Sequence, residues 1–166
     1  QTLAAGGAPG ADVNEAVALN KEAVAIYRTG PDAHSVVMAR TLIALARGLR
    51  RTGDLPGAEA AARECLAIRS ALDTPQNPDR WLTENARAMV GEILGDQDRF
   101  KEGEPFWVAA VTNMRTVVPG MTPDDPRAQG ALQGLVAFYR RWDKAHPGEG
   151  HGATADEWAS KAAPSK

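Results

Sequence analysis

The histidines and nearby carboxylates are the residues of this chain with the right chemistry to bind a metal ion. His146 and His151 flank a glycine-rich loop that also holds Glu149, and imidazole and carboxylate groups can share one divalent cation. Ordering such a loop around an ion costs conformational entropy, so a solvated insertion is the simpler interpretation. His34, beside Asp32, is interpreted as a capping or surface residue. We therefore predict no metal site and no cofactor.

No arrangement typical of a catalytic site is found in the sequence. It has no glycine-rich phosphate loop ending in Lys-Ser or Lys-Thr, no nucleophile elbow and no His-Glu-x-x-His zinc helix. The single cysteine, Cys65, is predicted to be a buried, inert thiol. A reactive thiol is the alternative, and it would need exposure and a nearby positive charge. We predict that the protein is not an enzyme; a metal or hydrolytic enzyme built on the two loop histidines is the alternative.

Arginines are the clearest candidates for ligand recognition. Arg40, Arg47 and Arg51 lie at positions i, i+7 and i+11, and hence on one face of a predicted helix. A guanidinium group can hold a carboxylate through two parallel hydrogen bonds, which indicates a site for an acidic peptide or chain end. The alternative is a solvated helix flank, paired with acidic neighbours such as Glu59 and Glu64.

The elements that carry these residues are predicted to be helices. Apolar residues recur at helical spacing, and strand-like runs are nearly absent. Asn77-Pro78 and Asp125-Pro126 each pair an N-cap residue with a proline at the first helical position. Thr154–Glu157 forms a capping box, which predicts the start of the last helix. The predicted helices span residues 12–28, 33–52, 56–72, 78–95, 100–118, 126–144 and 154–163.

The helical pattern repeats itself along the chain. Leu42, Leu45, Ala46 and Leu49 recur 45 residues later as Arg87, Val90, Gly91 and Leu94, and again as Leu132, Leu135, Val136 and Tyr139. A fixed period filled with helical pattern is typical of a solenoid, in which each repeat packs on its neighbours. We expect an all-α fold: a right-handed solenoid of helical hairpins with about seven helices.

The repeat also suggests a domain organisation. Residues 1–11 are rich in glycine and alanine and are predicted to form a flexible arm. A single repeat domain follows over residues 12–163. It is predicted to comprise a half repeat at 12–29, repeats at 33–72 and 78–118, and a degenerate capping repeat at 126–163.

Composition narrows the class of partner. The formal net charge is -2, so no nucleic acid is expected. No apolar run approaches the roughly 18–20 residues needed to cross a bilayer, so this segment is not expected to insert into a membrane. Because the chain begins at Gln1 rather than Met, we expect an upstream chain or a larger complex. The compartment is left open, with cytoplasmic and periplasmic or other extracytoplasmic locations as alternatives.

The distribution of large and small residues resembles the tetratricopeptide repeat family. The first complete helix pair has large residues and one small residue on its first helix, and Ala58, Ala62 and Cys65 where its second helix crosses. The period of 42–45 residues is longer than the usual ~34 of this family. It is similar to the long-period repeats of kinesin light chains and bacterial signalling proteins. Leu135–Trp142 and Asp156–Trp158 resemble the end of helical tails attached to bacterial serine/threonine kinases.

The resemblance implies that the first helix of each pair lines a concave face. The residues at its inner positions are Arg40, Ile43, Arg47, Arg50, Arg51, Asn85, Ala88, Glu92, Asp96, Gln133, Ala137, Arg140 and Arg141. The implied function is a non-catalytic protein–protein interaction module or scaffold of a larger bacterial assembly or signalling protein. Its partner would be a protein or acidic peptide in an arginine-lined groove. The alternative is a structural subunit docked in a multiprotein complex through its convex face or its ends.

The four tryptophans are the last candidates. Trp81 follows a proline-rich turn and is expected to be exposed as an interface anchor, with packing against the 73–79 linker as the alternative. Trp107 is predicted to lie in the core. Trp142 and Trp158 are expected to pack on each other across the last helix pair.

Overall fold

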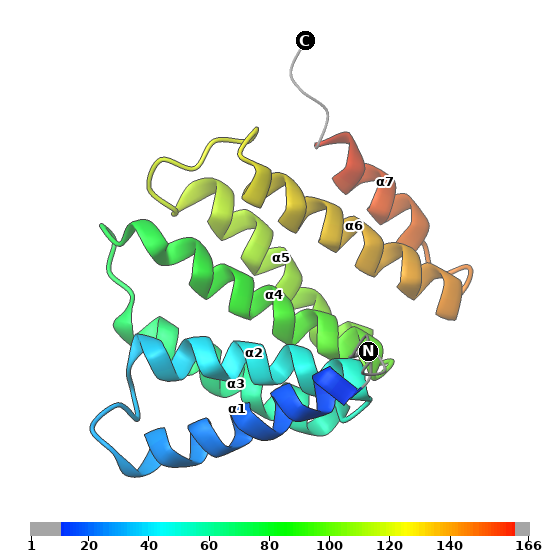
Figure 1. Ribbon diagram of the computed structural model, residues 1–166. Coiled ribbons are helices and arrows are strands. Elements are labelled where there is room, and N and C mark those ends of the chain that lie inside the picture. The colour runs from blue at the N-terminus through cyan, green and yellow to red at the C-terminus, as the bar shows by residue number, and fades with distance from the viewer. Residues whose placement is uncertain (1–10, 162–166) are drawn as a thin grey trace, which may run out of the picture. The chain divides into compact units, whose positions relative to one another are not determined.

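The computed structural model describes residues 11–161, and these residues form α-helices joined by turns and loops (Figure 1). The helices are α1 (Ala11–Thr29), α2 (Val36–Thr52), α3 (Leu55–Leu72), α4 (Trp81–Asp96), α5 (Phe100–Thr116), α6 (Pro126–Ala145) and α7 (His151–Ser160), with a short 3-10 helix η1 (Pro78–Arg80) before α4. The described residues contain seven α-helices and no strand, which confirms the predicted all-α class. Of the predicted arm at 1–11, residues 1–10 lie outside the described residues. None of the described helices is long and apolar enough to cross a lipid bilayer.

The chain divides into two compact units, residues 1–68 and 69–166, and the division falls within α3. The described part of the first unit contains α1, α2 and most of α3. The second unit contains η1 and α4 to α7. Each unit is therefore described by itself, and the single domain expected over residues 12–163 stays a prediction.

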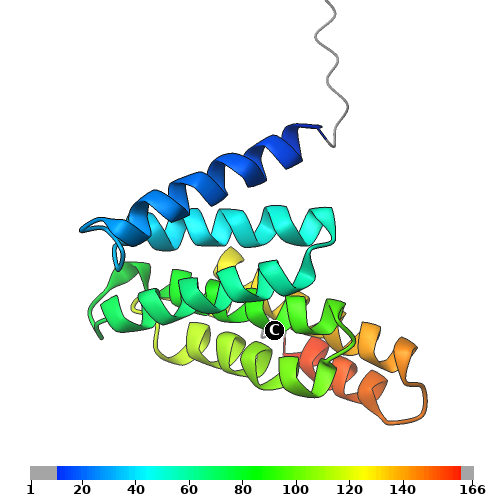
Figure 2. The ribbon, with the colours of Figure 1, turned by 90° about the horizontal axis from the view of Figure 1, so that it is seen from below.

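In the first unit, α1 and α2 run in opposite directions, as Figure 2 shows. The apolar face of α2 forms the core, with Met38 and Leu42 fully buried. Gly48 lets α1 approach closely, because a Cβ atom there would lie 2.6 Å from Val17 Cγ2. Cys65 of α3 is buried, and its thiol donates a hydrogen bond to Ala39 O at 3.1 Å. The prediction of a buried cysteine is confirmed.

In the second unit, α4 packs on α5 and α6, and α6 packs on α7. Helix backbones meet at glycines: a Cβ on Gly91 would lie 2.7 Å from Trp107 Cδ1 and 2.9 Å from Gly103 O. On the other side of the indole, a Cβ on Gly134 would lie 2.4 Å from Trp107 Cη2. The indole of α5 therefore fits between α4 and α6 only because both positions lack a side chain. Trp107 belongs to the core, as predicted.

Two helix starts follow the predicted proline motifs. The Asp125 side chain accepts a hydrogen bond from the Arg127 N–H, and α6 begins at Pro126. Asn77 caps in the same way through the Asp79 N–H at 2.9 Å. That cap opens η1 rather than an α-helix, and α4 follows at Trp81.

Two other helix starts differ from the expectation. Helix α2 begins at Val36 rather than at residue 33, because Ser35 is the N-cap and accepts a hydrogen bond from the Met38 N–H. Helix α7 begins at His151, three residues before the predicted Thr154–Glu157 box. The Gly152 N–H is satisfied by Asp143 Oδ1 of α6 at 2.9 Å. The capping group thus comes from the preceding helix, which a local sequence motif does not reveal.

The glycine contacts lead to a stability prediction. Gly91→Ala should lower the free energy of unfolding of the second unit by up to about 2 kcal/mol, because overpacking costs ~1–3 kcal/mol and the gain in helix propensity is about 1 kcal/mol. Gly130→Ala in α6 is the matched control, since a Cβ there meets nothing within 4 Å. Urea unfolding followed by tryptophan fluorescence reports this unit, because all four tryptophans lie in it. Equal stability of the two variants would contradict the packing account.

Candidate binding surfaces

A hollow between α1 and α2 in the first unit contains two of the predicted binding arginines. Its volume is about 560 Å³. The lining residues are Asp12, Val13, Ala16, Asn20, Ala44, Arg47, Gly48 and Arg51. Arg47 and Arg51 are exposed, so their guanidinium groups are available to a ligand in this hollow.

The charge of α2 sets this face apart. The helix carries four arginines and no acidic residue, and Arg40, Arg47 and Arg51 make no ion pair with any residue in the described range. The two acidic neighbours expected to neutralise them bind elsewhere: Glu59 accepts from Arg63 at 2.8 Å, and Glu64 pairs with Arg28. Arg47 and Arg51 are therefore exposed without the pairing to Glu59 or Glu64, and both the binding site and the solvated flank stay predictions.

The other two predicted positions on α2 are less accessible. Ile43 and Arg50 are both half-buried, and Arg50 has an interaction partner. Exposed positive charge on α2 is thus concentrated at Arg40, Arg47 and Arg51.

A smaller hollow of about 250 Å³ lies between α4 and α6 in the second unit. It brings together predicted positions from two helices. The lining residues are Asn85, Ala88, Met89, Glu92, Trp107, Gly134 and Ala137. Trp107 is buried, and its Nε1–H has no hydrogen-bond partner among the described residues. The floor of this hollow is thus apolar, with polar groups at Asn85 and Glu92.

Arg141 links α6 to Glu92, one of the residues that line this second hollow. Its guanidinium group donates to Glu92 at 2.9 Å and to Asp96 at 2.6 Å, so α6 is tied to two carboxylates one helical turn apart on α4. Arg140 instead lies 3.6 Å from Asp156 of α7, where both side chains are largely exposed. Gln133 is exposed. The arginine that faces α4 is therefore Arg141, and its charge is already neutralised within the unit.

Glu84 is a buried carboxylate that sequence reasoning missed. Only 2% of the residue is exposed, and it accepts hydrogen bonds from Arg87 at 2.8 Å and from Asn113 at 3.2 Å. Arg87 stands where the other repeats carry a leucine. The pairing with Glu84, one turn away, explains how the second repeat accommodates that charge.

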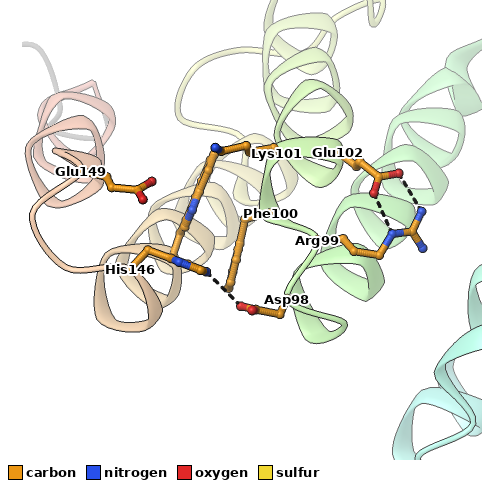
Figure 3. A pocket seen from close by; sticks show the side chains of 8 residues that line it. Asp98, Arg99, Phe100, Lys101, Glu102, His146 and Glu149 are labelled. Atoms are coloured by element: carbon orange, nitrogen blue, oxygen red, sulfur yellow. Dashed lines mark hydrogen bonds and ion pairs between the residues drawn. The ribbon is translucent and has the colours of Figure 1, made fainter.

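A third hollow, of about 320 Å³, lies where the α4–α5 turn meets the end of α6 (Figure 3). His146 Nε2 lies 3.3 Å from Asp98 Oδ1, and its ring meets Phe100 edge-on. Arg99 and Glu102, also drawn in Figure 3, bond to each other through two hydrogen bonds of 2.8 and 2.7 Å. The ionic groups around this hollow therefore largely satisfy one another.

The second loop histidine has a structural role of its own. The His151 ring stacks on Trp142 at a centroid distance of 3.7 Å, and its Nε2 lies 3.2 Å from Glu149. The described residues contain no group of three or more metal-ligating side chains. The loop between α6 and α7 is thus anchored at both ends by ring contacts, rather than being the purely solvated insertion expected.

The tryptophans near the C-terminal end pack differently from the expectation. Trp142 stacks on His151 rather than on Trp158, and Trp158 lies under the Lys161 ammonium group at 3.8 Å. Trp81 is not fully exposed: it is half-buried against the core of the second unit, and the Arg127 guanidinium group lies 5.2 Å from its ring.

Tyr139 of α6 carries a strongly perturbed hydroxyl group. Burial raises the pKa of this hydroxyl, and its hydrogen bond to Glu104 at 2.5 Å raises the pKa further. The ordinary tyrosine pKa is 10.0, so the unfolded chain loses this proton at a lower pH than the folded chain. The folded state should consequently lose stability as the pH rises above about 10.

The loss of stability at high pH can be tested with Tyr139→Phe. The variant should lose about 1 kcal/mol near neutral pH through the missing hydrogen bond, and its stability should fall less steeply above pH ~10 than that of the parent chain. Tyr27→Phe, at the only other tyrosine, is the control. Urea unfolding between about pH 8 and 11 brackets the ordinary tyrosine pKa and measures the effect. Parallel pH profiles for Tyr139→Phe and the parent would contradict it.

Comparison with known proteins identifies one repeat and the fold. Residues 38–72 match the sequence model of the tetratricopeptide repeat. No curated protein sequence matches the chain significantly. Two similar crystal structures show the nearly identical TPR-like repeats of a Podosopora anserina protein described as a kinesin light chain, and one of them is a variant with a substituted residue. Each is 17% identical to this chain and covers 90% of it, with TM-scores of 0.69 and 0.71.

The chain spans 65% of the length of those two structures. At 17% identity the likeness establishes the fold, and it agrees with the expected long-period helical repeat. Residues 38–72 are thus a tetratricopeptide repeat, set in a chain whose fold is that of tetratricopeptide-like helical repeats.

Proposed function

We propose that this chain is a non-catalytic interaction module that binds an acidic segment of a partner protein through the exposed arginines of α2. Helical repeats of this kind generally serve as protein–protein interaction modules and present extended binding surfaces. The observation that carries the proposal is the placement of Arg47 and Arg51 in one hollow, without an ion pair to any described residue.

The chemistry favours carboxylates as the recognised groups. A guanidinium group presents donors in a fixed fork that matches both oxygens of a carboxylate. Because Arg47 and Arg51 have no ion pair with described residues, a ligand would not have to displace an internal carboxylate. Arg40, seven residues before Arg47 on the same helix, would extend the positive potential and speed the encounter with an acidic partner.

The hollow of the second unit suits a different part of a partner. Its floor of Ala88, Trp107 and Ala137 is apolar, and we propose that it receives an uncharged side chain. Asn85, Glu92, Gln133 and Arg140 would then make polar contacts at its margins. Trp81 would contribute through its exposed edge.

A structural subunit is the second candidate, and one observation favours it. Leu19 and Ile26 of α1 are 60% and 61% exposed and lie seven residues apart, so they share one face of that helix. Such a surface suits permanent docking in a larger complex. A subunit of that kind should aggregate when isolated, whereas an interaction module should remain a stable monomer; analytical ultracentrifugation of the full chain separates the two.

The binding proposal is tested by charge reversal. A fluorescein-labelled peptide that is rich in Glu and Leu and as long as a typical helix should bind the full chain. The double variant Arg47→Glu with Arg51→Glu should weaken that binding at least tenfold. The reason is that each charge-assisted hydrogen bond contributes about 1.5–3 kcal/mol and ~1.4 kcal/mol corresponds to a factor of ten. Fluorescence anisotropy at two salt concentrations measures the affinity.

Lys101→Glu with Lys144→Glu is the matched control, because both lysines are exposed, lie in the second unit and give the same change in net charge. The control should retain most of the affinity. If both double variants weaken binding equally, the peptide responds only to net charge and the α2 site is wrong.

A further inference from the structure

The pair α1–α2 and the pair α5–α6 are equivalent parts of the repeat. Equivalent positions are 87 residues apart in α1 and α5, and 90 residues apart in α2 and α6. The core positions agree: Val24 and Val111 are both buried, and so are Leu42 and Leu132. Each unit can therefore be used to interpret the other without assuming how the two units are placed.

The two pairs differ in what covers them. Figure 1 shows α4 lying along α5, and α4 contacts both α5 and α6. Under α4, Gly103, Trp107 and Ala110 of α5 are buried. In the described part of the first unit, no helix takes the equivalent place on α1 and α2.

The uncovered face of α1 shows the consequence. Ala16, Asn20 and Ala23 are the equivalents of the three buried α5 residues, yet Ala16 is exposed and the other two are only half-buried. The 560 Å³ hollow lies over Ala16 and Asn20. The first unit therefore presents a helix-packing surface that lacks the helix found on its counterpart.

An arginine at the same position in both pairs indicates the chemistry of the missing helix. Arg51 of α2 is equivalent to Arg141 of α6. Arg141 binds Glu92 and Asp96, four residues apart on the covering helix α4. Arg51 lines the hollow of the first unit, is exposed, and forms no ion pair with a carboxylate of the described residues.

We infer that the hollow between α1 and α2 binds an amphipathic helix of a partner protein, which carries two carboxylates four residues apart that pair with Arg51. This inference rests on the proposed function and specifies its ligand. The bound helix would lie on α1 and α2 as α4 lies on α5 and α6.

Two differences between the pairs refine the expected sequence of that helix. Asn20 stands where α5 has Trp107, and Gly48 stands where α6 has Phe138, so the first unit lacks the two aromatic rings of the second. The partner helix must fill this space with large apolar side chains where α4 has Gly91. Arg47 stands where α6 has Ala137, so a third acidic group on the partner helix would be favoured.

A second copy of the chain fits this surface poorly. Among the described helices, only α4 carries two carboxylates four residues apart, Glu92 and Asp96, and Arg141 already binds both. Because no described helix offers Arg51 a free pair of carboxylates, we assign its charge complement to a different protein.

The probes are three labelled peptides of identical length and net charge. The first is a helix, stapled on its outer face, with leucines along one side and two glutamates four residues apart beside them. The second carries the same staple but places the glutamates two residues apart, on different faces of the helix. The third is unstapled and rearranged so that a central proline prevents helix formation. Binding to the full chain is measured by fluorescence anisotropy.

The inference predicts that the first peptide binds at least tenfold more tightly than the other two. Arg51→Glu should abolish this preference, and a version of the first peptide with lysines in place of the two glutamates should restore binding to Arg51→Glu. Ala16→Trp, which fills the hollow without changing charge, should also weaken the first peptide at least tenfold. Circular dichroism of both variants checks that they remain folded.

The outcomes separate this inference from the proposed function. If all three peptides bind equally well and all depend on Arg47 and Arg51, the acidic-segment function stands and the helix is wrong. If none binds, both fail. Failure of the lysine peptide to rescue Arg51→Glu would overturn the pairing with Arg51. A concentration-dependent dimer that Arg51→Glu dissociates would show that a second copy is the occupant, and would overturn the assignment to a different protein.

Discussion

Close approach of helix backbones is the constraint on which the rest of this structure depends. Helices of a repeat can pack only where small residues meet large ones. Gly91 and Gly134 leave room for the Trp107 indole, and Gly48 leaves room for Val17. Because these positions lie in helix–helix contacts, they are not available to bind a partner protein. Binding chemistry is left to side chains at the margins of the packed faces, such as Arg47 and Arg51.

The same packing surface has different roles in the two units because of what covers it. Over α5 and α6, helix α4 buries the indole of Trp107 and supplies Glu92 and Asp96 to Arg141. Over α1 and α2, the described part of the first unit supplies no covering helix and no ion pair to Arg51, which faces a hollow. An arginine that is a structural tie in one unit is thus a candidate recognition residue in the other. The different roles of Arg141 and Arg51 depend on whether a helix covers them, not on the arginine itself.

Sequence reasoning predicted what local patterns determine. The helical period located the helices, and the Asp125-Pro126 motif located the start of α6 within the chain. It failed where the partner lies on another helix: Asp143 of α6 caps α7, and His151 rather than Trp158 stacks on Trp142. In the candidate sites, Asn85, Ala88, Glu92 and Ala137 do line one hollow, because helical spacing fixes which residues share a face. Spacing could not show that Arg141, next to Arg140, is the residue that faces α4.

The most direct test of the account is a titration of the full chain with the stapled diacidic peptide, followed by NMR of the arginine Nε–Hε groups. Formation of carboxylate pairs should shift the Arg51 and Arg47 resonances and leave Arg141 unchanged, because Arg141 already binds Glu92 and Asp96. Shifts confined to Arg141, or no shift at Arg51 at saturating peptide, would contradict the central claim that α2 recognises a partner's acidic helix.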